Sequence, residues 1–254
     1  MSTTPMTRPM LHCILRGSLG AVVLPAGLRR IGVDGLNAVV RDVDPGQVRA
    51  ADTTLLQGYA NLIARIHADA TLIPMRFGCV FATDDVVRRL LDGHRSQLLA
   101  TLDHLDDCVE FGIRLVISTP SQASPLGQRN AGPVPDPGTI GPLDHDRRPG
   151  HGHLAAIRQR LSGDARAAER ARAARGAIEQ AVAGLFRTLR EEFGQIGGRY
   201  LLSLYFLVPR GDSAHFVERL RSDQSKVPGT GLLTGPWPPY NFVGAIDDDL
   251  RSLA

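Results

Sequence analysis

The residue types that perform catalysis are present in this sequence, but they form no recognisable reactive arrangement. His151 and His153 flank Gly152, and imidazole is a common metal ligand. However, no cysteine, histidine or carboxylate cluster lies near them at the spacing of a known metal site. Serine, histidine and acidic residues occur without the nucleophile elbow of a hydrolase. We therefore expect no catalytic residue, no metal site and no enzymatic activity.

The glycine-rich and acidic segments do not predict a cofactor or an ion either. Gly17-Ser18-Leu19-Gly20 matches neither the dinucleotide-binding pattern nor the P-loop pattern. Asp247-Asp248-Asp249 lacks the ligand pattern of a calcium loop and is typical of a solvated acidic tail. We expect no bound cofactor.

Residues 234–242 are the most unusual segment, and they indicate packing or binding. Their prolines remove backbone donors and hold φ near about −65°, so this stretch should be extended, stiff and unsuited to a central strand. Trp237, the only tryptophan, and Tyr240 are aromatic rings presented by this backbone. Packing in the protein's own core and contact with a partner both remain open. If Trp237 packs inward, Tyr240, nearer the end of the segment, is the candidate for the exposed ring that faces a partner.

An arginine within an apolar run marks a second candidate segment. Arg76 lies in residues 72–80, which predict a strand with Pro74 at its start or edge, and Gly78 permits close backbone approach. A buried or half-buried guanidinium requires a carboxylate or several carbonyl groups as partners. An ion pair that orients the strand is favoured over a ligand-binding role. Taken together, the two segments supply the candidate partner-binding residues, which are Trp237, Pro238, Pro239, Tyr240, Phe242, Arg76 and Phe77.

Composition excludes several other classes of protein. With 254 residues, 43% apolar and 22% charged, the chain can bury one large core or two smaller ones. The net charge of +3 comes with no domain-wide basic excess, so no nucleic-acid partner is expected. No apolar run approaches the roughly 20 residues of a membrane span, and the amino terminus lacks a signal-peptide pattern, so we expect a cytoplasmic protein. Cys13, Cys79 and Cys108 should be buried free thiols.

These segments must be positioned by a mixture of helices and strands. The amino-terminal half predicts a strand at 10–15, a second strand within 31–43 that is centred on 36–40, a helix at 45–69, the strand at 72–80, two helical runs from 84 to about 109, and a closing strand at 111–118. The carboxyl-terminal half predicts a helix at 154–193, a strand at 200–208, a helix that begins at Asp212 or Ser213, and a last strand around 232–233. The long helix carries the apolar stripe Ile178, Val182, Leu185, Phe186, Leu189 and Phe193.

The two unusual segments, taken in order, resemble a known family. Residues 72–81 (LIPMRFGCVF), the following helices and residues 110–115 (EFGIRL) look like the central signature of the gas vesicle GvpL/GvpF family. Residues 233–243 (LTGPWPPYNFV) resemble its closing motif. The resemblance extends from about Leu11 to Val243 and does not distinguish a GvpF-like from a GvpL-like protein.

The resemblance implies an α+β protein of two domains, the carboxyl-terminal half ferredoxin-like. We expect an amino-terminal α+β domain at 9–118, a Pro/Gly-rich linker at 119–152, and a ferredoxin-like domain with the long helix at 153–254. The implied function is an accessory role in gas vesicle assembly. The protein would bind the hydrophobic shell protein or other accessory proteins and could become a minor component of the vesicle. A small-molecule-binding regulatory α+β protein is the alternative.

Overall fold

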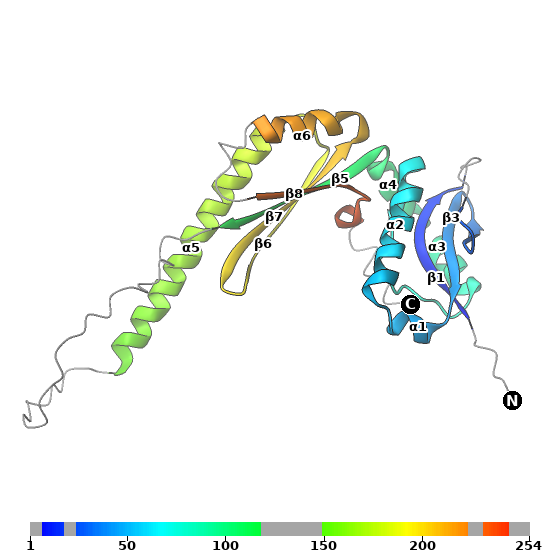
Figure 1. Ribbon diagram of the computed structural model, residues 1–254, viewed down its shortest axis with the longest axis horizontal. Coiled ribbons are helices and arrows are strands. Elements are labelled where there is room, and N and C mark those ends of the chain that lie inside the picture. The colour runs from blue at the N-terminus through cyan, green and yellow to red at the C-terminus, as the bar shows by residue number, and fades with distance from the viewer. Residues whose placement is uncertain (1–6, 18–23, 118–148, 223–230, 244–254) are drawn as a thin grey trace, which may run out of the picture.

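The computed structural model describes residues 7–17, 24–117, 149–222 and 231–243. They form two units, each built on a four-stranded antiparallel sheet (Figure 1). The first sheet has the strand order β2-β3-β1-β4, and the second has the order β6-β7-β5-β8. The predicted α+β class is confirmed. Residues 118–148, which hold nearly all of the predicted linker, lie outside the described residues, as does the acidic segment at 247–249.

Helices cover both faces of the first sheet. Its strands are β1 (Arg8–Arg16), β2 (Arg29–Val33), β3 (Leu36–Val43) and β4 (Leu72–Pro74). On one face, α2 (Thr53–Asp69) packs Tyr59, Ile63 and Ile66 into a core with the strands. On the other face, α3 (Asp84–Gly93) and α4 (Arg95–Leu105) supply a second core. The three cysteines are buried and free, as the sequence predicts.

The strand predicted within 31–43 and centred on 36–40 is β3, and a hairpin turn joins it to β2, which the sequence did not separate. Asp34 and Gly35 both have positive φ, 33° and 84°, and form the turn between β2 and β3. An Asp-Gly pair favours this kind of tight hairpin turn. The chain therefore reverses within a stretch that has nearly continuous strand character.

The helix predicted at 45–69 is interrupted. Asp44 caps the short α1 (Pro45–Arg49) by accepting from the amide of Gly46, as predicted. Asp52 then caps α2 by accepting from the amide of Leu55. A second side-chain cap therefore starts a new helix where the apolar periodicity alone suggests continuation.

The strand predicted at 72–80 is also shorter than expected. β4 ends at Pro74, which pairs with Cys13 at the edge of the sheet. Arg76 follows in an exposed turn with Gly78, whose φ is 97°. The expectation of a buried or half-buried Arg76 inside a strand is therefore wrong, because the strand ends before it.

The second unit contains the order strand, helix, strand, strand, helix, strand. Its elements are β5 (Cys108–Ile117), α5 (Pro149–Ala181), β6 (Thr188–Ile196), β7 (Arg199–Pro209), α6 (Ser213–Ser222) and β8 (Gly231–Trp237). This element order is compatible with the predicted ferredoxin-like half. The strand predicted to close the amino-terminal half is β5, and it pairs instead with β7 and β8. The first strand of the second sheet thus precedes the predicted linker.

The predicted helix at 154–193 ends earlier than expected. α5 stops at Ala181, Gly184 takes a φ of 82°, and residues 188–196 form β6 against β7. Ile178 and Val182 are buried in the predicted core, and Leu189 packs partly against it, but Phe193 is 38% exposed. The spacing of four between Leu189 and Phe193 fits one helix face, and it also fits one strand face. The periodicity therefore could not separate the two structures here.

The second sheet has one helical face and one open face. α5 and α6 cover one side of this sheet (Figure 1). Phe111 and Phe206 project from that side, and Phe216 of α6 packs against both rings. The opposite side is called the open face below. Tyr205 and Leu207 on this face pack against the core of the first unit, which joins the two units. In the described part of the chain, no helix is long and apolar enough to span a membrane.

Candidate partner-binding site

The closing segment begins as an edge strand that lies unusually near β5. β8 pairs with β5, and a register shift lies between Glu110 and Gly112. A Cβ atom at Gly235 would lie 2.6 Å from the carbonyl oxygen of Glu110, and Gly235 has a φ of 117°. Pro236 is tolerated because β8 is the last strand on its side of the described sheet. Gly235 therefore permits the close approach of β8 to β5, and Pro236 is compatible with the position of β8 at the edge of the sheet.

A buried carboxylate fastens the end of this segment to β5. Glu110 is 5% exposed, and its two carboxylate oxygens accept from the backbone amide of Asn241 at 2.8 Å and from the side-chain amide at 2.6 Å. Burial raises the pKa of Glu110, while the hydrogen bonds from Asn241 favour its charged form. We refer to this pair as the Glu110–Asn241 clasp.

The residues after Trp237 fold back into the protein. Pro238 and Pro239 are buried, and Tyr240–Phe242 form the 3-10 turn η3. Phe242 lies in the core of the first unit beside Val243, and the guanidinium of Arg190 lies 5.9 Å from its ring centroid. The expectation of an extended backbone therefore holds up to Trp237 and fails at the turn.

The two aromatic rings lie opposite to the arrangement considered from the sequence. Trp237 is 52% exposed, so it does not pack inward. Tyr240, expected to be the exposed ring, is partly buried against the core between α2 and the first sheet. The reason is the turn at η3, which directs the chain after Pro239 toward the first unit.

Phe77 and Arg76 follow β4 in the first unit, whereas Trp237 ends β8 in the second. Phe77 is half-buried and packs against the same core as Tyr240, with its ring perpendicular to that of Tyr59 at 5.2 Å. Arg76 is exposed. The structure therefore brings the two family-like segments to one core through Phe77 and Tyr240.

Three exposed apolar side chains lie on the open face. Leu232 is in register with Arg114, and Trp237 with Glu110, so both project on the side opposite Phe111 and Ile113. Ile196 projects to the same side, at the end of β6. Ile196, Leu232 and Trp237 are 69%, 62% and 52% exposed. A groove of about 630 Å³ follows the other side of β8, where Val217, Leu233 and Pro236 contribute to its lining. The strand is thus accessible from both sides.

The match to known proteins decides the family. The family model of the gas vesicle synthesis protein GvpL/GvpF matches residues 11–244. The chain belongs to the GvpL/GvpF family. Gas vesicle protein L of Streptomyces sp. (strain CB03234) is 31% identical over 97% of this chain and 93% of its own length. Gas vesicle protein F of the same strain is 29% identical over 91% of this chain and 94% of its own length.

Solved structures of GvpF have the same fold. The crystal structure of GvpF from Anabaena sp. PCC7120 superimposes with a TM-score of 0.66 at 18% identity, covering 94% of this chain and 96% of that one. GvpF from Microcystis aeruginosa gives a TM-score of 0.67 at 14% identity, covering 94% of this chain and 99% of that one. The present chain therefore has the GvpF fold.

Sequence reasoning missed part of the site in this GvpL/GvpF protein. Glu110 belongs to the family-like signature at 110–115, but a lone glutamate in a strand gives no signal for a clasp to Asn241. Leu232 and Ile196 were not selected, because apolar residues in a strand predict a core. Within the described ranges, no group of three or more His, Cys, Asp and Glu residues could hold a metal ion.

Proposed function

We propose that this protein is an accessory factor of gas vesicle assembly that binds the small hydrophobic shell protein along β8. Membership of a family named for gas vesicle synthesis supports the vesicle context. The observation that carries the binding role is the exposure of Leu232 and Trp237 on a strand with no outer neighbour among the described residues. This role requires binding and no chemistry, and it places the protein in the cytoplasm and on the forming vesicle.

The physical basis of the proposed contact is strand addition. An edge strand presents unpaired backbone amides and carbonyls, which can pair with an extended segment of another chain. Leu232 and Trp237 would then cover apolar side chains of the added segment on the open face. A shell protein that is prone to aggregate would be shielded by this contact before it enters the vesicle wall.

The clasp and the prolines support this surface by fixing its shape. β8 pairs with β5 before Trp237, and Glu110 and the first core hold Asn241 and Phe242 after it. Trp237 therefore lies between two fixed ends of the segment. Little side-chain and backbone entropy would then be lost when a partner binds. Of the proposed partner-binding residues, Pro238, Pro239, Tyr240, Phe242 and Phe77 act in this proposal as supports, while Trp237 makes the contact and Arg76 lies on a separate exposed turn.

Co-expression with the shell protein tests this proposal. The double variant Leu232→Asp, Trp237→Ser should lose capture of the shell protein and vesicle formation while its melting temperature stays near that of the wild type. Leu56→Asp is the matched control, because Leu56 is 44% exposed on α2 in the other unit. Normal capture by the double variant would reject β8 as the binding surface.

The alternative, a small-molecule-binding regulatory protein, is supported by a different part of the structure. A pocket lies in the first unit, between α2 and the sheet. Binding in this pocket is compatible with the assembly role.

A further inference from the structure

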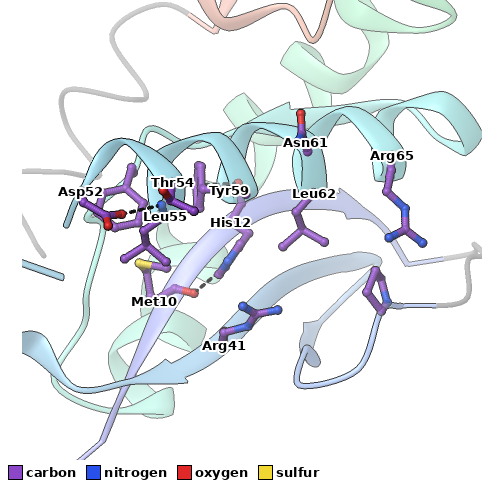
Figure 2. Close-up of a pocket in the computed structure, with 13 residues that line it drawn as sticks. Met10, His12, Arg41, Asp52, Thr54, Leu55, Tyr59, Asn61, Leu62 and Arg65 are labelled. Atoms are coloured by element: carbon purple, nitrogen blue, oxygen red, sulfur yellow. Dashed lines mark hydrogen bonds between the residues drawn. The ribbon is translucent and has the colours of Figure 1, made fainter. Parts of the chain in front are cut away.

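A pocket of about 510 Å³ lies between α2 and strands β1 and β3 of the first sheet. Figure 2 shows α2 along one side and the two strands along the other, with side chains from all three directed into the space. The volume falls within the range of about 300–1,000 Å³ that is typical of small-molecule sites. The pocket is in a different unit from β8, so it is separate from the proposed contact with the shell protein.

Two arginines give the pocket a positive charge. Arg41 comes from β3 and Arg65 from α2, and in Figure 2 both guanidinium groups extend toward the space between helix and sheet. The Nε atom of Arg41 is buried and has no hydrogen-bond partner in the part of the chain that the structure describes. A buried donor without a partner is costly, and a bound acceptor would remove that cost.

The remaining polar groups of the lining leave this charge in place. Asp52 is the one carboxylate among the lining residues, and its Oδ1 accepts from the amide of Leu55 as the cap of α2. His12 donates from Nδ1 to the carbonyl of Met10 at 3.0 Å, and burial lowers its pKa to about 4, so it is neutral near pH 7. The hydroxyl of Tyr59 donates to the carbonyl of Met75 at 2.7 Å. The two guanidinium groups therefore outnumber the single carboxylate.

An apolar wall faces the arginines. It is formed by Met10, Leu55, Tyr59, Leu62 and Phe77. Leu55 is 43% exposed at the mouth, and Tyr59 presents its ring because its hydroxyl is already bonded. A ligand that fits this lining must combine an apolar body with an anionic group.

We propose that this pocket binds a small organic oxyanion, with a carboxylate or phosphate head between Arg41 and Arg65 and an apolar chain against Leu55, Leu62 and Phe77. Arginine suits both heads, because its guanidinium donates two parallel hydrogen bonds to carboxylate or phosphate oxygens. Occupation of this pocket would stabilise the first unit by mass action. The contacts of Phe242 and Leu207 with the first core would extend this stabilisation to the second unit.

Titration of the purified full-length protein with defined probes tests the site. Octanoate and octyl phosphate are the two anionic arms, octanol is the neutral arm, and inorganic phosphate is the arm without a chain. Isothermal titration calorimetry measures each affinity, and the amide signal of Gly58, which lines the pocket, reports the location by nitrogen-15 NMR. We expect saturable binding of at least one anionic probe, with octanol and inorganic phosphate each at least about tenfold weaker.

Variants connect the binding to the two arginines. Arg41→Gln and Arg65→Gln should each weaken binding of the anionic probe by about tenfold, because each removes a charge-assisted contact. Arg89→Gln is the control, since Arg89 is exposed on α3 at the opposite face of the sheet, and it should bind as the wild type does. Thermal melts confirm that all variants are folded.

Three results would overturn the proposal. One is the absence of saturable binding by either anionic probe. Another is unchanged affinity in the double variant Arg41→Gln, Arg65→Gln. The third is equal affinity for octanol and octanoate, or for inorganic phosphate and octyl phosphate, because then the charge or the apolar wall would play no part. These measurements use no shell protein, so their outcome is distinguishable from failure of the assembly role.

Discussion

At the scale of single residues, replacing glycine by alanine should have opposite effects on stability at Gly235 and at Gly58, because the two positions have different surroundings. Gly235→Ala would place a Cβ atom 2.6 Å from the carbonyl oxygen of Glu110, at a φ of 117° that L-residues rarely adopt. We expect a loss of at least about 3 kcal/mol in the free energy of unfolding. Gly58→Ala meets no atom within 4 Å in α2 and should stabilise the protein by up to about 1 kcal/mol. Urea denaturation measures both, and a Gly235→Ala variant as stable as wild type would contradict the close packing of β8 on β5.

At the scale of elements, the closing segment depends on the Glu110–Asn241 clasp. Asn241→Ala removes the 2.6 Å bond from the side-chain amide and leaves the buried carboxylate with the backbone donor alone. The free energy of unfolding should fall by about 2 kcal/mol. Asn61→Ala, at an exposed position on α2, should change it by less than about 0.5 kcal/mol. Equal stability of the two variants in urea melts would show that the clasp contributes nothing.

The sequence predicted most elements but not all of their limits. Asp44 and Pro45 marked a helix start correctly because capping is a local interaction within one turn. A predicted limit was wrong where a second local signal competed with the apolar periodicity, as at Asp52, which caps a new helix. Another was wrong at β6, where pairing with β7 determines the structure and the spacing of Leu189 and Phe193 is ambiguous.

The candidate site was less predictable than the fold. The prolines indicated an extended segment that is not a central strand, and β8 is extended and lies at the edge of the described sheet. Which ring is exposed depends on the turn at η3 and on contacts with the first unit, and these are distant in sequence. The partnership of Glu110 with Asn241 spans 131 positions, so no local pattern reveals it.

At the scale of the whole molecule, two buried histidines make stability depend on pH. Burial lowers the pKa of His12 and of His67 to about 4 in the folded protein, against about 6.5 when unfolded. The unfolded chain therefore binds more protons between these values, and the folded state loses stability as pH falls from about 6.5 toward 4. By pH 5 the loss is about 2 kcal/mol for each histidine.

His67 is the better residue for testing this dependence, because it also joins the units. Its Nε2 donates to the carbonyl of Cys108 at the start of β5, and Arg210 donates to the backbone carbonyl of His67. In urea melts from pH 7 to pH 5, His67→Gln should lose stability less steeply than the wild type, whereas His215→Gln, at an exposed position on α6, should follow it. Burial raises the pKa of Glu110, so this carboxylate makes the folded state more stable as pH falls. Because all three proteins contain Glu110, this effect cancels when their curves are compared. Parallel curves for His67→Gln and wild type would contradict this account.

The assembly role, finally, requires that the two units present β8 to the shell protein while the closing segment is held between them. A photo-crosslinking amino acid introduced at Trp237 in vesicle-forming cells tests this most directly, because it records contact at one position without relying on loss of function. The same amino acid at Leu56 is the control, since that position is exposed on the other unit. We expect a crosslink to the shell protein from position 237 and none from position 56. Crosslinks from position 56 alone, or none from position 237 in cells that form vesicles, would contradict the assembly role.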